Sequence, residues 1–313
     1  MDLTYMPPGP EPQPAPGVVD PTGMVVSGVP CRRCSYDLRG LNVTARCPEC
    51  GAPVGVAVHG PLLRYSDPEW VGNLARGTAF VFWGILLGFL LSFTAGLLLR
   101  PLGPRVAPIV GAMGGLVYLY GVWLMTEPDP SGVGEDQYGT ARRIIRFTTI
   151  VGIVQNVLSV AEPDVQYSRA LTIAFGVASL AAGLIGVVGQ FAELRYLQRL
   201  ALRIPDERLS RRARFLFWAF GGSLVAVILL GGMAGIGGFL FVRLARGNPM
   251  TNWIAAVVAG LGILAGIAVI AMLVFGLMYL RLLHRLKRAF RQQAEYARLV
   301  WATAAAQARA QGV

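Results

Sequence analysis

The four cysteines of the chain are the residues whose type and spacing best fit a defined chemistry. Cys31, Cys34, Cys47 and Cys50 follow the pattern C-x2-C-x12-C-x2-C. Each C-x-x-C turn presents two thiolates to one metal ion, and two such turns complete a tetrahedral shell of four sulfurs. A module this short cannot build a sufficient apolar core, whereas bound metal can supply about 10–16 kcal/mol of folding free energy. The pattern therefore predicts a structural metal site.

The identity of the metal follows less directly from the spacing. A shell closed by four thiolates leaves no coordination position for catalysis, which favours Zn2+ in a structural role. Fe is the alternative, because it accepts the same ligands. The chain contains only two histidines, His59 and His284, and no Glu-x-x-His motif of a di-iron site. With no electron-transfer partner in the sequence, we expect redox-silent zinc.

The elements that carry this module have the composition of a membrane protein. The chain has 313 residues, of which 54% are hydrophobic and 14% are charged, whereas soluble domains carry about a quarter charged residues. We therefore expect an all-α integral membrane protein with about six transmembrane helices. The expected spans are 77–99, 106–126, 144–161, 171–191, 214–242 and 253–280. Segment 144–161 is the doubtful one, because it is short for a bilayer core of about 30 Å.

The distribution of basic residues decides between five and six spans. The net charge is +11, and six spans with the N-terminus inside leave five of the 28 basic residues outside. These five are Arg100, Arg105, Arg169, Arg243 and Arg246. Without segment 144–161, more basic residues lie outside than inside, against the positive-inside rule. We therefore expect a multi-pass protein of the bacterial inner membrane with both termini cytoplasmic, so that reduced thiols bind metal rather than form disulfide bonds.

The sequence divides into five regions. Residues 1–30 contain eight prolines and no basic residue, which is typical of a disordered tail. The others are a zinc-ribbon module at 31–56, an interfacial amphipathic helix at 62–76, the six-helix transmembrane domain at 77–280 and a cytoplasmic C-terminal helix at 281–313.

The helix at 62–76 is expected to begin after Asp67, a plausible N-cap that precedes Pro68. Its apolar residues include Trp70, which we place at the level of the lipid head groups. In the helix at 281–313, the apolar residues lie broadly on one side beside several arginines, which predicts contact with anionic lipid or with another helix. They are Leu283, Leu286, Phe290, Tyr296 and Val300.

Several groups within the helical region have a structural and a functional interpretation. Three G-x-x-x-G pairs, at 84/88, 231/235 and 262/266, predict close helix packing inside one chain, with homodimerisation as the alternative; the oligomeric state does not follow from the sequence. Gln155 and Asn156 predict hydrogen bonds between helices, with a polar substrate path as the alternative. Glu193 and Arg195 are expected at the membrane interface.

The loop at 127–146 contains a group of four acidic residues, Glu127, Asp129, Glu135 and Asp136. They lack the spacing of a calcium loop. We expect a solvated loop that pairs with arginines of the neighbouring loop, with a metal site as the alternative.

The stretch CRRCSYDLRGLNVTARCPECG resembles rubredoxin-like and zinc-ribbon modules, through its paired C-x-x-C turns, Tyr36 and the CPECG ending. It also resembles the N-terminal module of uncharacterised multi-pass membrane proteins of the planctomycete type. The resemblance implies a zinc ribbon on a helical membrane domain and no particular activity. Ser35 stands where glycine is usual, which costs about 1 kcal/mol if φ is positive there.

Three classes of function remain after these observations. No catalytic constellation is visible, so we do not expect an enzyme. The favoured hypothesis is binding or organisation of a cytoplasmic protein partner by the ribbon, whose surface carries Arg32, Arg33, Arg39 and Arg46. A nucleic-acid partner is not expected. The alternatives are a transporter or channel with a regulatory ribbon and a rubredoxin-like iron protein.

Overall fold

The computed structural model describes residues 17–98, 106–130, 135–165, 169–204 and 251–310, and in part residues 211–229. Its helices are α1 (Val54–Val58), α2 (Pro68–Leu98), α3 (Val106–Met125), α4 (Glu135–Val165), α5 (Arg169–Ala201) and α7 (Thr251–Ala310), with a 3-10 turn, η1, at Leu63–Tyr65. Within these ranges there are isolated β-bridges but no β-strand. The chain divides into two compact units, residues 1–210 with 283–313 and residues 211–282.

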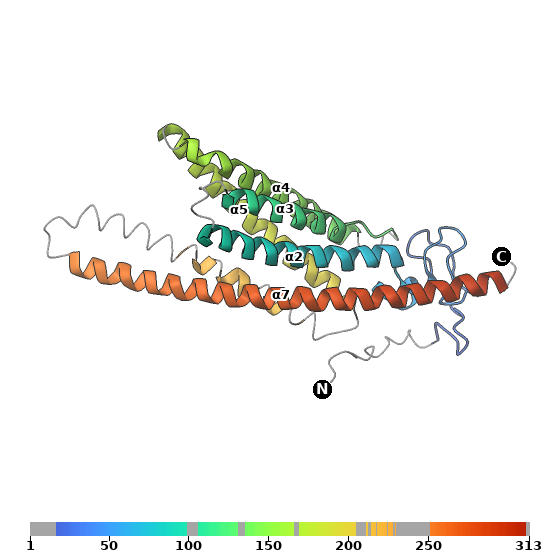
Figure 1. Cartoon of the computed structure of the whole chain (residues 1–313). Helices are drawn as coiled ribbons and strands as arrows, with labels where there is room; N and C mark the ends of the chain where they lie inside the picture. The colour runs from blue at the N-terminus through green and yellow to red at the C-terminus, as the bar shows by residue number, and fades with distance from the viewer. Residues whose placement is uncertain are drawn as a thin grey trace. The chain divides into compact units, whose positions relative to one another are not determined.

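Among the described residues, four helices are long and apolar enough to cross a membrane: Pro68–Ala95, Tyr138–Val160, Ile173–Ala201 and Ala259–Thr303. They include the doubtful third segment, which lies inside the 31 residues of α4 (Figure 1). The apolar parts of the second and fifth segments form shorter helices, Ile109–Met125 and Arg214–Val227. Residues 230–242 of the fifth segment lie outside the described residues.

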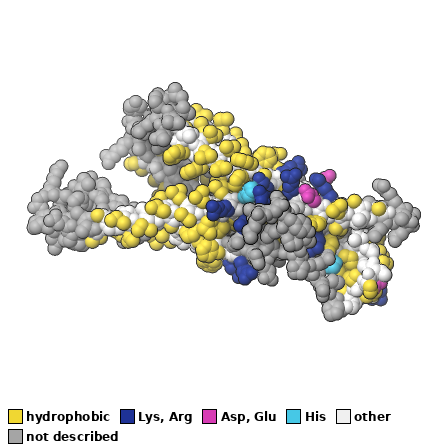
Figure 2. Space-filling model, turned by 60° about the horizontal axis from the view of Figure 1, so that its bottom comes forward, with side chains coloured by type: hydrophobic (Ala, Val, Ile, Leu, Met, Phe, Trp, Pro, Cys, Tyr) yellow, Lys and Arg dark blue, Asp and Glu magenta, His cyan; other side chains and the backbone are white. Residues whose placement is uncertain are grey.

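The apolar helices keep many large side chains exposed. Phe93, Leu180 and Ile263 are 60%, 67% and 66% exposed, each in a different helix. Figure 2 shows wide hydrophobic areas on one face of the protein, with Lys and Arg side chains gathered in one region of it. Extensive apolar surface of this kind is compatible with a membrane protein.

The region at 62–76 differs from the separate interfacial helix that the sequence predicts. It contains η1 and the first turns of α2, which runs from Pro68 to Leu98 without a break. The cap is as predicted, because Asp67 Oδ1 accepts hydrogen bonds from the N–H groups of Glu69 (2.9 Å) and Trp70 (3.0 Å). Trp70 is buried, and its Nε1 donates to the carbonyl of Glu127 at 2.9 Å. Trp70 therefore faces the interior of the protein instead of lipid, because residues of other loops cover it.

Glycines allow α2 and α3 to pack closely. A Cβ added at Gly84 would lie 2.9 Å from the Cα of Tyr118, and one added at Gly121 would lie 2.6 Å from the backbone nitrogen of Val81. The predicted 84/88 pair therefore makes an intramolecular contact, in which Gly88 meets Gly114. The 231/235 pair lies outside the described residues, and a Cβ at either residue of the 262/266 pair meets nothing within 4 Å.

Arg203, just after α5, joins three parts of the chain. It is 4% exposed, and its guanidinium donates to the carbonyl of Pro61 (2.7 Å), the hydroxyl of Ser66 (2.9 Å) and the carboxylate of Asp129 (2.8 Å). The guanidinium also lies 5.1 Å from the ring centroid of Trp70. The predicted pairing of the acidic loop with an arginine of another loop is thus present at Asp129. The pair is buried rather than solvated, because the segment leading to α2 covers it.

Glu193 is buried inside the protein, whereas the sequence predicts that it lies at the membrane interface. Its side chain is buried, and the hydroxyl of Tyr118 on α3 donates to it at 2.5 Å, whereas Arg195 is exposed. The two residues lie on different sides of α5, because a helix turns about 200° over two residues. Gln155 donates to the hydroxyl of Ser179 at 2.7 Å, joining α4 to α5, which is the predicted hydrogen bond between helices. Asn156 bonds within its own helix, to the carbonyl of Gly152.

The predicted C-terminal helix continues directly from the last apolar segment as the second half of α7; residues 311–313 lie outside the described part. Its apolar side is not a lipid-facing surface throughout, because Leu283, Leu286 and Phe290 are fully buried in the protein. Val300 packs against a cluster formed by Val56, Leu62 and Tyr65. Tyr296 remains exposed.

Candidate metal centre

The two C-x-x-C turns have the same backbone hydrogen bonds. The N–H of Cys31 donates to the carbonyl of Tyr36 (2.7 Å), and the carbonyl of Cys31 accepts from the N–H of Ser35 (2.9 Å). The second turn repeats both bonds. The N–H of Cys47 donates to the carbonyl of Ala52 (2.8 Å), and the N–H of Gly51 donates to the carbonyl of Cys47 (2.9 Å). Isolated bridges, Pro30 with Asp37 and Arg46 with Pro53, close the two loops at equivalent positions. The module is therefore built from one local structure used twice.

Both turns need a left-handed residue directly after their second cysteine. Gly51 meets this need with φ of 70°, a conformation that costs glycine little. Ser35 has φ of 63° and is the one non-glycine residue with positive φ in the described part of the chain. The sequence-based concern about this position is confirmed, and the first turn carries local backbone strain.

Backbone amides point at the sulfurs. The N–H groups of Arg33 and Cys34 bond the Cys31 sulfur, and those of Glu49 and Cys50 bond the Cys47 sulfur. Partial burial opposes ionisation of Cys31, but these bonds, with those from the neighbouring thiols, lower its pKa to about 7. For Cys47 the effect of burial is the larger one, and its pKa is raised. Amides aimed at sulfur stabilise thiolates, which are the form that binds metal.

The four sulfurs lie where one ion could bind all of them. They all fall within 4.8 Å of one another, and the short distances run between the turns: 3.6 Å from Cys31 to Cys50 and 3.5 Å from Cys34 to Cys47. Four thiolates at Zn–S distances near 2.3 Å would stand about 3.8 Å apart in a tetrahedron. The cysteines are all free thiols. The residues therefore fit a tetrathiolate metal ion, and the same geometry would accept iron.

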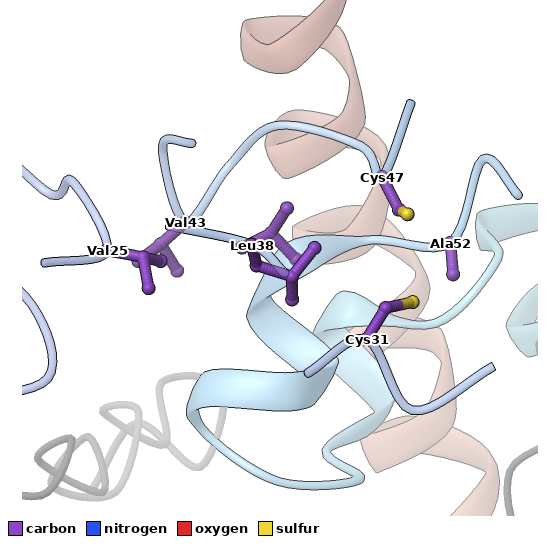
Figure 3. Close-up of a cluster of buried hydrophobic side chains, with 7 residues drawn as sticks. Val25, Cys31, Leu38, Val43, Cys47 and Ala52 are labelled. Atoms are coloured by element: carbon purple, nitrogen blue, oxygen red, sulfur yellow. The ribbon is translucent and has the colours of Figure 1, made fainter. Parts of the chain in front are cut away.

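A small apolar core supports the site from one side. Cys31 and Cys47 are buried, and Figure 3 shows their sulfurs near each other beside Ala52, with Leu38, Val43 and Val25 farther along the cluster. Cys34 is exposed and Cys50 is half-buried. One side of the cage thus faces the core and the other faces solvent.

This core corrects the predicted boundary of the module. Residues 17–30 were expected to belong to the disordered tail, but Val25 is 1% exposed within the core, and its N–H donates to the carbonyl of Leu41 at 2.9 Å. A signal was present in the sequence, because five valines fall between Gly17 and Pro30. We call residues 17–58 the cysteine module from here on. Residues 1–16 lie outside the described residues.

The cysteine module contacts the C-terminal half of α7 through Arg46. The Arg46 guanidinium carbon lies 3.7 Å from the ring centroid of Trp301, a cation–π contact. The other predicted surface arginines are exposed: Arg33 donates to the carbonyl of Cys50 (3.3 Å), and Arg39 lies 3.9 Å from the Asp37 carboxylate. The contact with Trp301 could not be predicted, because 255 residues separate the partners.

Comparisons of the chain with protein-family models, curated proteins and solved structures found no match. The resemblance of the cysteine segment to zinc ribbons and to planctomycete-type membrane proteins stays a prediction from the motif. The candidate site therefore rests on its own geometry: four clustered free thiols, held by two equivalent turns, on a chain whose described part contains four long apolar helices.

Proposed function

We propose that this protein is a six-helix inner-membrane protein whose zinc-loaded cysteine module binds or organises a cytoplasmic protein partner. The observation that carries the proposal is the way the module presents its first turn. Arg32, Arg33 and Tyr36, which are close in sequence, are all exposed, and Tyr36 is 40% exposed. Arginine and tyrosine are enriched among the residues that dominate binding energy at protein interfaces. The module is also held on the α7 side by Arg46 and Trp301, which favours a fixed surface.

Zinc is the proposed ion because a closed tetrathiolate shell suits a structural metal without redox chemistry. Bound zinc would fix the two C-x-x-C turns of the module against each other. Metal analysis of the purified protein tests this directly: one zinc per chain supports the proposal. Iron, with the red colour of an iron–tetrathiolate centre, would instead establish the rubredoxin-like redox alternative.

The membrane topology of the proposal comes from the basic residues. Six spans place all but five of them on the side of the termini, and a reducing cytoplasm keeps the four thiols available for metal. An impermeant probe applied to intact cells should leave the amino-terminal segment unlabelled, and labelling should appear after lysis. Labelling in intact cells would place the cysteines outside and contradict the topology.

The partner is tested by co-purification from solubilised membranes. The variant Arg32→Glu with Tyr36→Ala changes the exposed surface and leaves all four ligands in place, so zinc content should stay at one per chain while the partner is lost. Arg39→Glu, on the same module beside Asp37, is the matched charge control and should retain the partner. If the set of recovered proteins is the same for all three forms, the module is not the docking surface.

A transporter or channel is the second candidate, and buried Glu193 is the observation that favours it. An ionisable side chain within a membrane-spanning helix commonly marks an ion or proton path, although a structural hydrogen bond with Tyr118 explains it equally well. If this candidate is correct, the reconstituted protein dissipates a proton gradient, and Glu193→Gln abolishes the dissipation. Tyr118→Phe removes the hydrogen bond to Glu193 and should leave the protein folded. Equal leakage from wild-type and variant liposomes would remove this candidate.

A further inference from the structure

A groove runs between the start of α2 and the C-terminal half of α7, away from the cysteine cage. Its volume is about 1010 Å3. The α2 wall is formed at 69, 72, 73, 75, 76 and 79, and the α7 wall at 284, 287, 288, 291, 294, 295 and 298. Apart from Ala75, which lies at the edge of the α2 set, the positions repeat at three- and four-residue intervals, so each set lies on one face of its helix. The α7 wall runs from residue 284 to residue 298, a rise of about 21 Å at 1.5 Å per residue.

The groove is strongly cationic. Its lysine and arginine residues are Arg76, Lys287, Arg288, Arg291 and Arg298, against the acidic residues Glu69 and Glu295. The contact between Arg291 and Glu295, at 3.7 Å, is a solvent-exposed pair and neutralises little of this charge. Arg76 and Arg288 are exposed on opposite walls, so their guanidinium groups are accessible to a ligand. Guanidinium forks of this kind suit phosphate oxygens.

The groove begins at the boundary between the apolar part and the charged part of each helix. On α2 the apolar stretch starts at Thr78, and on α7 it ends at Leu283. Phe82 lies at this end, with the His284 ring 5.9 Å from it and the Lys287 ammonium 5.5 Å from its ring centroid. In a bilayer, this boundary between apolar and charged side chains falls at the level of the lipid phosphates.

From these observations we infer that the groove binds the phosphate head group of an anionic phospholipid, with Arg76 on α2 and Arg288 on α7 as phosphate ligands. The inference rests on the proposed insertion of α2 and α7 in a membrane and is independent of the metal and of the protein partner. A soluble phosphate compound has the same chemistry as a ligand, so the experiment separates the two sources.

The full-length protein in neutral detergent is titrated with short-chain phosphatidylglycerol and, separately, with phosphatidylcholine, and binding is measured by native mass spectrometry. Phosphatidylglycerol should bind more tightly. Arg288→Glu and Arg76→Glu should each weaken it about tenfold, the loss expected when a charge-assisted hydrogen bond is removed. Arg285→Glu is the matched control, because Arg285 is an exposed arginine on the same helix that does not line the groove, and it should change binding less than twofold.

Three outcomes would overturn the inference: equal binding of the two lipids, equal losses for Arg285→Glu and Arg288→Glu, or displacement of phosphatidylglycerol by inorganic phosphate or ATP at comparable concentration. The last would assign the groove to a soluble anion. Zinc content and partner recovery are measured on the same variants and should not change, so a failure here is distinguishable from a failure of the proposed function.

Discussion

Ser35 shows how a single side chain sets the stability of the metal site. It adopts φ of 63°, where Gly51 stands at the equivalent position of the second turn. Ser35→Gly should therefore stabilise the metal-loaded module by about 1 kcal/mol, because the Cβ strain of a left-handed residue disappears. The measurement is the chelator concentration that removes half of the metal. Ser35→Ala keeps the Cβ and should show no gain; equal gains for both variants would mean that the hydroxyl, and not the backbone, is responsible.

Arg203 is the second residue whose role can be tested singly. Arg203→Met should lower the free energy of unfolding by about 3–5 kcal/mol, because it removes the buried guanidinium that pairs with the carboxylate of Asp129. Asp129→Leu combined with Arg203→Met should recover most of this loss, since no buried charge then remains. Thermal unfolding in one detergent measures all three proteins. A double variant as unstable as the single one would show that the contacts of Arg203 with Pro61 and Ser66 matter more than the ion pair.

Among the helices, the pair α2 and α3 depends most on side-chain size. Gly121→Ala would place a methyl group 2.6 Å from the backbone nitrogen of Val81, and backbone cannot move aside cheaply. We expect a loss of about 1–3 kcal/mol, typical of overpacking. Gly152→Ala on α4 is the matched control, because a Cβ there meets nothing within 4 Å and alanine favours helix. Thermal unfolding in detergent measures both, and equal stability of the two variants would contradict close packing of α2 on α3.

At the scale of the whole molecule, the cysteine module and the end of α7 should respond together to metal. Removing the ion should unfold the module, because metal binding and folding are coupled in units of this size. Trp301 would then lose its contact with Arg46, and Val300 its packing on Val56. We expect chelation to speed tryptic cleavage after Arg298 at least severalfold, measured by mass spectrometry of timed digests.

The same digest distinguishes a specific contact from general loosening. Trp301→Ala should show fast cleavage even with metal bound, whereas Trp301→Phe keeps an aromatic face for the guanidinium and should stay close to wild type. If chelation leaves the cleavage rate of the wild-type protein unchanged, the metal and the C-terminal half of α7 are not coupled.

The sequence by itself determined the features that depend on local pattern. Cys31 and its three partners could be predicted as one site, because each C-x-x-C turn is a local structure and both turns here form the same backbone hydrogen bonds. Long apolar runs predicted helices, and Asp67 predicted the start of α2, since a cap acts on the amides two and three residues ahead. The strain at Ser35 was likewise a local property of its turn.

Only the tertiary structure decided which parts of the chain meet. The valines of 17–30 join the core of the module instead of a disordered tail, and Trp70 and Leu286 are buried in the protein instead of facing lipid. The buried pair of Arg203 with Asp129, the contact of Arg46 with Trp301 and the cationic groove all join residues far apart in sequence. The physical reason is that periodicity shows that a helix has an apolar or charged face, but not what covers that face.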